Sequence, residues 1–197
     1  MHHTAHTSGR SAVDDNRDGG KMYQGVIMSG FGGQGIISAG VLLAYSGMMD
    51  GKHVTFFPAY GAEMRGGTAN CSVVVSTDEV ASPVVSSPDS LIVMNEPSLL
   101  KFESSLKPQG FLLINKSLVS SQPKRTDVTI VTIDANKIAE EIGTVKCANM
   151  VMLGALINRT QAVSMESMIR ALPKVFSHAK KEMLEMNENA LNKGGTY

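Results

Sequence analysis

The 197-residue sequence contains no tryptophan, only two cysteines and no excess of either charge. Lysine plus arginine number 18 and aspartate plus glutamate also number 18, so the formal net charge is zero. A neutral chain gives no electrostatic reason to expect nucleic acid or an anionic membrane surface as a partner. No apolar run approaches the roughly 20 residues that a membrane-spanning helix needs. These absences favour a soluble globular protein.

The sequence also lacks the usual signatures of catalysis and metal binding. Cys71 and Cys147 lie far apart and outside any C-x-x-C motif, which favours two reduced thiols in a cytoplasmic protein. A zinc or iron–sulfur site would need about four ligands, so this chain is not expected to hold one alone. No Ser-His-Asp arrangement or G-x-S-x-G motif stands out. We therefore predict no catalytic residue and no metal ligand, as in a subunit whose chemistry lies elsewhere.

Length and composition indicate one folded domain with a sizeable core. Hydrophobic residues make up 43% of the chain, which is typical of globular proteins. Residues 1–21 are polar, carry three histidines and show no periodicity. We expect them to be a disordered leader or the remnant of a tag. Residues 22–197 are predicted to form the single domain.

Apolar periodicity predicts alternating strands and helices. Strands are predicted over residues 23–28, 53–57, 70–76, 90–95, 109–115 and 128–134. Helices are predicted over residues 36–49, 96–106, 136–143 and 149–160, and over a long stretch from 164 to about 192 that Pro173 starts or kinks. Pro58 is expected to end the second strand, and residues 59–69 are expected to form a loop. The alternation predicts an α/β fold, a three-layer α/β/α sandwich with a parallel or mixed central sheet.

The strand at 70–76 follows a loop instead of a helix. It is therefore the strand expected to run antiparallel and to make the sheet mixed. The first strand, helix and second strand are predicted to form a Rossmann-like βαβ unit with a right-handed connection.

A glycine-rich turn lies between the first strand and the first helix. The segment "SGFGGQGII" at 29–37 matches G-x-G-x-x-G through Gly30, Gly32 and Gly35. Such a turn lets an anion approach the free N–H groups at the start of the helix. A dinucleotide site also needs an acidic residue after the second strand, and a P-loop needs Gly-Lys-Ser/Thr. Both are missing here, so NAD binding is only the alternative hypothesis.

A second glycine-flanked segment, "YGAEMRGG", occupies residues 60–67. Glu63 and Arg65 could form a surface ion pair worth roughly 0–1 kcal/mol. Alternatively, the glycines could let Arg65 reach a carboxylate, a phosphate or the backbone of a partner. Both interpretations stay open on the residues alone.

Several segments in a fixed order resemble one known family. They are "GFGGQGIISAG", "PAYGAEMRGGTANCSVVVS", "SP" at 82–83, "DSLIVMNEPSLLKF" and "ANMVMLGAL". Together they resemble the gamma subunit, or gamma domain, of the 2-oxoacid:ferredoxin oxidoreductases, over about residues 23–195. That family includes pyruvate, 2-oxoisovalerate, 2-oxoglutarate and indolepyruvate enzymes of anaerobic metabolism.

The resemblance implies an activity for a complex, not for this chain alone. The complete enzyme would convert a 2-oxoacid and CoA to acyl-CoA, CO2 and reduced ferredoxin. It would use thiamine diphosphate, Mg and 4Fe–4S clusters, none of them held by this chain alone. The implied partners are alpha, beta and ferredoxin-like delta subunits, with ferredoxin as electron acceptor. An isolated gamma chain is expected to be inactive and could self-associate.

The resemblance also suggests site residues, either for cofactor binding or for a subunit interface. They are Gly30, Gly32, Gly33, Gln34, Gly35, Tyr60, Gly61, Glu63, Arg65, Gly66, Gly67 and Asn95. Because the first two segments each follow a strand of the βαβ unit, we hypothesise that they form one edge of the sheet. That edge would face partner subunits near the 2-oxoacid or CoA end of the active site. The alternative is a free-standing NAD- or nucleotide-binding protein of Rossmann type.

Overall fold

The computed structural model describes residues 21–60 and 68–197, whose centre is a six-stranded sheet. Its strands are β1 (Tyr23–Phe31), β2 (His53–Tyr60), β3 (Thr68–Ser76), β4 (Ser90–Val93), β5 (Phe111–Asn115) and β6 (Thr129–Ile133). They lie in the order β2-β3-β1-β4-β5-β6. β3 runs antiparallel to both of its neighbours, whereas β1, β4, β5 and β6 run parallel. The predicted mixed sheet, with β3 as its antiparallel strand, is confirmed.

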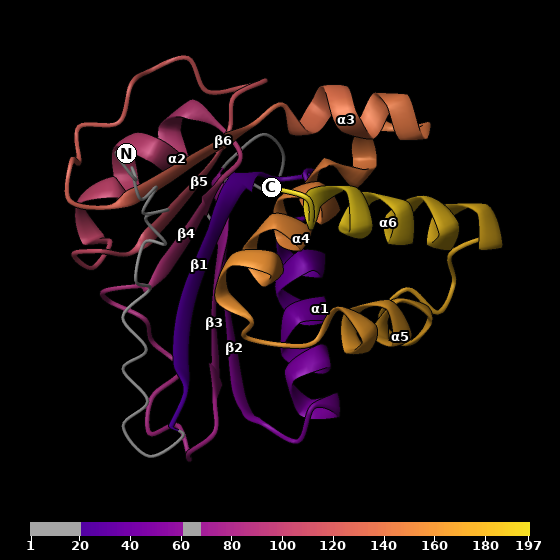
Figure 1. The fold of residues 1–197 in the computed structure, drawn as a ribbon, viewed down its shortest axis with the longest axis horizontal. Coiled ribbons are helices and arrows are strands. Elements are labelled where there is room, and N and C mark those ends of the chain that lie inside the picture. The colour runs from indigo at the N-terminus through magenta and orange to yellow at the C-terminus, as the bar shows by residue number, and fades with distance from the viewer. Residues whose placement is uncertain (1–20, 61–67) are drawn as a thin grey trace, which may run out of the picture.

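The helices lie in two unequal layers (Figure 1). They are α1 (Ile36–Met49), α2 (Glu96–Phe102), α3 (Ala135–Ile142), α4 (Ala148–Thr160), α5 (Met165–Val175) and α6 (Lys181–Gly194), with 3-10 turns at Glu103–Ser105 and Val145–Cys147. Side chains of α1 and of α3 to α6 share one buried cluster with one face of the sheet, while α2 packs on the other face. The α/β/α sandwich is therefore confirmed. None of the helices in the described ranges is long and apolar enough to cross a membrane.

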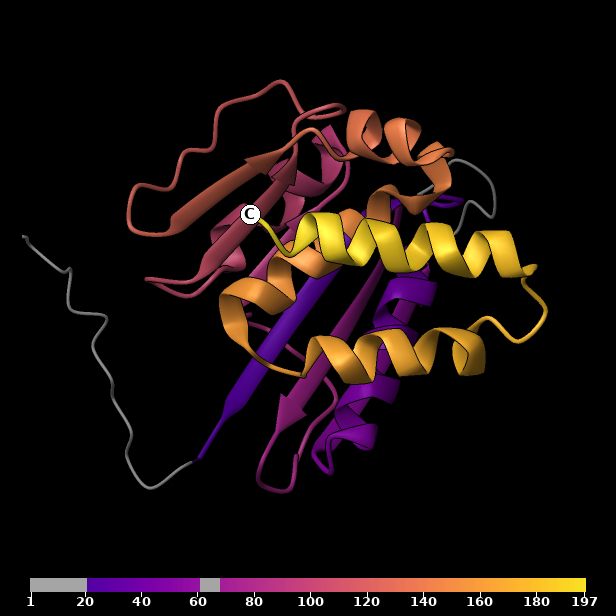
Figure 2. The same cartoon turned by 45° about the vertical axis from the view of Figure 1, so that its right-hand side comes forward.

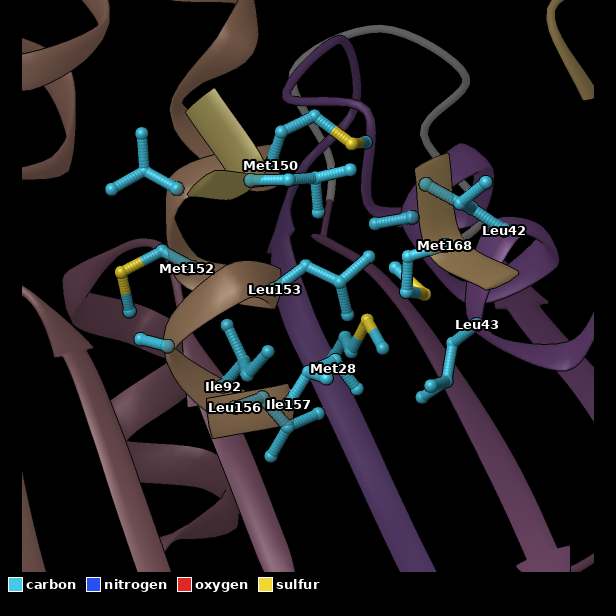
Figure 3. Packing of buried hydrophobic residues seen from close by; sticks show 14 of the residues in the cluster. Met28, Leu42, Leu43, Ile92, Met150, Met152, Leu153, Leu156, Ile157 and Met168 are labelled. Carbon is cyan, nitrogen blue, oxygen red and sulfur yellow. The ribbon is translucent and has the colours of Figure 1, made fainter. Parts of the chain in front are cut away.

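Helix α4 forms the centre of the larger layer. Its residues from 148 to 157 are all buried, as expected of a helix that is apolar nearly all round. Figure 3 shows Leu153 of α4 in one buried cluster with Met28 of the sheet, Leu42 and Leu43 of α1 and Met168 of α5. Helix α6 covers the opposite side of α4 (Figure 2). The apolar composition of α4 thus follows from having neighbours on every side.

The second strand does not end at Pro58, so that prediction is wrong. β2 continues to Tyr60, with Pro58 paired opposite Cys71. Among the described strands, β2 lies at one edge of the sheet and pairs with β3 alone. A proline nitrogen has no hydrogen to donate, which an edge strand tolerates where that nitrogen faces away from its neighbour.

The predicted helical stretch from 164 to about 192 is two helices, and Pro173 does not start either of them. Pro173 lies inside the last turn of α5, which ends at Val175. The ring of a proline displaces the preceding turn of a helix, so an end soon after it is expected. Lys180 is extended (φ −66°, ψ 154°) and leads into α6. The break lets α6 turn back over α4 (Figure 2).

Two sequence predictions cannot be compared with the structure. The predicted leader lies outside the described residues except for Lys21, and single-domain organisation of 22–197 stays a prediction. Segment 61–67 also lies outside the described residues.

Helices α4 and α6 approach each other so closely that only glycine fits where they cross. A Cβ on Gly154 would overlap the carbonyl group of Leu191, and a Cβ on Gly194 would overlap the carbonyl of Val151. The two backbones therefore touch directly, without side chains between them.

Asp50, the residue that follows α1, connects α1 to α5. Its carboxylate accepts hydrogen bonds from the backbone N–H of Ser164 at 2.6 Å, from the Ser164 hydroxyl at 3.0 Å and from the Ser167 hydroxyl. Partial burial disfavours the charge of this carboxylate. The hydrogen bonds from both serines and the charge of Lys52 outweigh the burial, so the pKa of Asp50 lies below the ordinary value.

We expect Gly154→Ala to lower the free energy of unfolding by about 2 kcal/mol or more, because the added methyl group would force α4 and α6 apart. Urea denaturation measures the change. Gly195→Ala is the matched control, since its Cβ would overlap no backbone atom: its nearest neighbours are the flexible methyl end of Met165 at 3.2 Å and the carbonyl oxygens of Asn192 at 3.3 Å and Leu191 at 3.5 Å. Equal midpoints for the two variants would contradict the close crossing.

Asp50→Asn keeps the size of the side chain and removes its charge. We expect the free energy of unfolding near neutral pH to fall by about 1 kcal/mol. The pKa of Asp50 is lower in the folded protein than in the unfolded chain. Its charge therefore stabilises the fold above the unfolded value of about 3.9, and this contribution is lost as the pH falls through the folded value. The difference in urea midpoint between wild type and variant should shrink in acid; a constant difference would contradict this role.

Candidate functional site

The candidate site lies at the edge of the sheet where β1 and β4 to β6 end, at the top of Figure 1. β2 also ends there, because both β1 and β2 are antiparallel to β3. Phe31 pairs with Thr68, and Tyr60 pairs with Ala69. The residues that flank segment 61–67 therefore lie beside the end of β1, where the glycine turn begins.

Part of the predicted site cannot be placed. Gly61, Glu63, Arg65, Gly66 and Gly67 lie outside the described residues. The backbone of Tyr60 ends β2, and its side chain is not described.

The glycine turn itself is well defined. β1 runs three residues further than expected, through Gly30 to Phe31, so the turn begins at Gly32. Gly35 has a left-handed conformation (φ 70°) and is the N-cap residue of α1. Among the described residues, no side chain caps α1 and its first turn has no acidic residue. The first N–H groups of α1 are thus open to water or to a negative group.

Gln34 joins the turn to both central strands. Its Oε1 accepts a hydrogen bond from the N–H of Phe31 at 2.6 Å, and its Nε2 donates to the carbonyl oxygen of Met94 at 3.2 Å. A Cβ on Gly30 would lie 2.5 Å from Gln34 Oε1 and 2.9 Å from Met94 Cβ. The absence of a side chain at Gly30 therefore leaves room for the Gln34 amide. Both hydrogen bonds of that amide are made to the backbone of the fold itself.

Asn95 has a structural position at the same edge. It is 1% exposed and begins α2, its Oδ1 accepting a hydrogen bond from the N–H of Ser98 at 3.0 Å. Its Nδ2 is buried with no hydrogen-bond partner in the described part of the chain. The side chain thus faces the interior beside α2.

Two hollows flank the glycine turn, and Gly33 contributes to both. One has a volume of about 140 Å³ and is lined by Gly33, Gln34, Met94, Asn136, Val145, Lys146 and Ala148. The other has a volume of about 350 Å³ and is lined by Phe31, Gly32, Gly33, Gly35, Ile36, Ile37, Ser38 and Ala69. None of these lining residues is acidic. Lys146 supplies a positive charge to the smaller hollow.

Asn136 and Lys146 line the smaller hollow and are candidate site residues that the sequence reasoning missed. The Oδ1 of Asn136 accepts a hydrogen bond from Asn115 Nδ2 at 2.9 Å, which leaves the Nδ2 of Asn136 as a donor. Asn136 comes shortly after β6 and Asn115 ends β5. The signal was available, because ligands of α/β proteins bind beyond the carboxyl ends of the strands.

Both cysteines lie in surroundings that disfavour the thiolate, the reactive form of the side chain. Cys71 and Cys147 are both buried. Burial raises the pKa of Cys71 to about 12 and also raises the pKa of Cys147. Within residues 21–60 and 68–197, no three side chains of the metal-binding types come together.

Comparison with known proteins identifies relatives over most of the chain. The 2-oxoglutarate synthase subunit KorC of Methanocaldococcus jannaschii is 38% identical over 88% of this chain and 93% of its own length. The ketoisovalerate oxidoreductase subunit VorA of Methanothermobacter thermautotrophicus is 36% identical over 87% of this chain. The match covers 36% of that subunit, so the chain spans about a third of its length.

Solved structures share the fold. The gamma subunit of a keto/oxoacid ferredoxin oxidoreductase from Geobacter sulfurreducens has a TM-score of 0.74 and 29% identity, covering 87% of this chain and 95% of its own. A 2-oxoglutarate:ferredoxin oxidoreductase from Magnetococcus marinus, solved with 2-oxoglutarate, coenzyme A and succinyl-CoA, has a TM-score of 0.80 and 25% identity. That match covers 88% of this chain and 30% of the other.

The family model for pyruvate ferredoxin/flavodoxin oxidoreductase matches residues 25–197. This range includes β1 from Gly25 onward, the glycine turn and every later element of the fold. The resemblance seen in the ordered sequence motifs is thereby confirmed, and the chain belongs to the pyruvate ferredoxin/flavodoxin oxidoreductase family.

Proposed function

We propose that this chain is the gamma subunit of a 2-oxoacid:ferredoxin oxidoreductase, which forms acyl-CoA, CO2 and reduced ferredoxin from a 2-oxoacid and CoA. The observation that carries the proposal is the match to a separate KorC subunit over 93% of that subunit's length. A free-standing dinucleotide-binding protein has no comparable support. The resemblance of the glycine turn to a Rossmann fingerprint reflects the shared strand-to-helix geometry.

The chain would contribute structure, or complete a site, without carrying the reaction alone. Its two cysteines are too few to hold a 4Fe–4S cluster, and both are buried. The clusters would therefore belong to partner subunits. The family resemblance implies the same for thiamine diphosphate and Mg, with alpha, beta and delta subunits as the partners, in the cytoplasm. The VorA relative, in which the matching region is about a third of one longer chain, supports a domain that works beside other domains.

The edge of the sheet that carries the glycine turn, called the glycine edge below, would bind the negatively charged part of a substrate. A partner subunit would bind the same substrate from the other side. A 2-oxoacid carries a carboxylate and CoA carries phosphates, and both are anions. The uncapped start of α1, the Nδ2 of Asn136 and the charge of Lys146 all favour an anion. Arg65 would add a second cation from the neighbouring segment.

The edge can be tested in the co-expressed complex with Lys146→Ala, Gln34→Ala and Arg65→Ala. We expect each variant to assemble, and Lys146→Ala and Arg65→Ala to raise the KM for CoA or for the 2-oxoacid about tenfold, since each removes one charged contact. Lys124→Ala is the matched control, because Lys124 is also exposed but lies in the loop that precedes β6, away from the carboxyl edge. Wild-type assembly, acyl-CoA formation and CoA affinity in all three variants would refute the proposed edge.

Because the cofactors are assigned to partner subunits, the proposal predicts how the isolated chain behaves. Purified alone, it should be colourless and should not oxidise pyruvate, 2-oxoisovalerate or 2-oxoglutarate in the presence of CoA and ferredoxin. The complex purified through this subunit should be brown and active. Visible absorbance and an acyl-CoA assay distinguish the two preparations, and activity of the colourless chain would contradict its role as a subunit.

A further inference from the structure

Asn149 reaches the glycine turn from the first turn of α4, 114 residues further along the chain. Its Nδ2 donates a hydrogen bond to the carbonyl oxygen of Gly35 at 2.9 Å. Its Oδ1 accepts one from the backbone N–H of Met150, also at 2.9 Å. Since one partner can only accept and the other can only donate, the orientation of the amide is fixed. The side chain is 7% exposed, so little water competes for these bonds.

Gly35 and Asn149 fit each other closely. A Cβ on Gly35 would overlap the Asn149 amide nitrogen and would lie 3.3 Å from its Cγ. The left-handed backbone of Gly35 independently disfavours a side chain. The absence of a side chain at position 35 is thus what lets α4 make contact with the start of α1.

This contact helps to determine where an N–H group of the turn points. The carbonyl of Gly35 and the N–H of Ile36 belong to one planar trans peptide and point in opposite directions. The Gly35 oxygen accepts two hydrogen bonds at 2.9 Å, one from Asn149 and one from the N–H of Ala39 within α1. The bond from α4 therefore adds a second constraint on this peptide, and with it on the direction of the Ile36 N–H, beyond the one that α1 itself supplies. Gly35 and Ile36 both line the hollow of about 350 Å³. Gln34 fixes the preceding part of the turn to Met94.

We infer that Asn149 is a positioning residue that holds the glycine turn ready for an anion before any ligand or partner arrives. The inference rests on the proposed function for the identity of the anion, but the holding of the turn itself does not. When hydrogen-bond donors are already aligned, no binding free energy is lost in ordering them. A loosened turn should therefore weaken binding without changing the chemical step.

Two variants of Asn149 separate positioning from stability. Asn149→Asp keeps the size and the acceptor for Met150 but replaces the donor with a carboxylate oxygen that repels the Gly35 carbonyl. Asn149→Ala removes both bonds. Asn187→Ala is the matched control, because Asn187 is similarly buried (6% exposed) and accepts a hydrogen bond at 3.2 Å from Cys147. That bond joins α6 to the residue just before α4, so its loss disturbs the same packing without removing the bond to Gly35.

The first measurement is amide hydrogen exchange of the full chain. We expect either Asn149 variant to speed exchange across residues 31–39 about tenfold, and Asn187→Ala to leave that segment within about twofold of wild type. Unchanged exchange at 31–39 in both Asn149 variants would overturn the inference, whatever the kinetics. Equal acceleration in Asn187→Ala would also overturn it, because the effect would then be one of general destabilisation.

The second measurement is steady-state kinetics of the assembled complex. We expect the Asn149 variants to raise the KM for CoA or for the 2-oxoacid by about fivefold, with kcat within about twofold. If the Asn149 variants accelerate exchange at 31–39 but keep the wild-type KM, Asn149 positions the turn. The proposed contact between the turn and substrate would then be refuted. A fall in kcat at unchanged KM would overturn the inference, since positioning for binding predicts the opposite split.

Discussion

The structure depends on the burial of α4, which is enclosed by the sheet, by α1 and α5, and by α6. A helix without a solvent-facing side can be stabilised by apolar contacts all round, but it must fit its neighbours closely. Gly154 and Gly194 give it that fit against α6. At its first turn the same helix presents Asn149 to the carbonyl of Gly35. The core and the glycine edge are therefore two parts of one packing arrangement.

The order of elements could be read from the sequence because apolar periodicity reflects burial on one side or both. The helix predicted over 36–49 coincides with α1, and the antiparallel direction of β3 follows from the missing helix before it. The errors occurred where tertiary contacts decide. Pro58 stays in a strand because that strand is at the edge, and α5 and α6 separate because α6 packs back over α4.

The candidate site was only partly visible in the sequence. The glycine turn and the resemblance to a family could be recognised there, because both are local patterns of residue types. Asn136, Lys146 and Asn149 could not be, because their relevance comes from strands and helices that meet at one edge from distant parts of the chain. Gln34 belongs to a motif that could be recognised in the sequence, but its side chain forms its hydrogen bonds within the fold.

Pro58 has a consequence for the behaviour of the chain outside a complex. The outer edge of β2 is where a strand from another molecule could add to the sheet, as happens at the start of many aggregates. Continuous addition needs a regular series of N–H donors along that edge, and Pro58 has none. Pro58 therefore interrupts the series of donors along β2, which makes this edge a poorer template for the addition of a strand from another molecule.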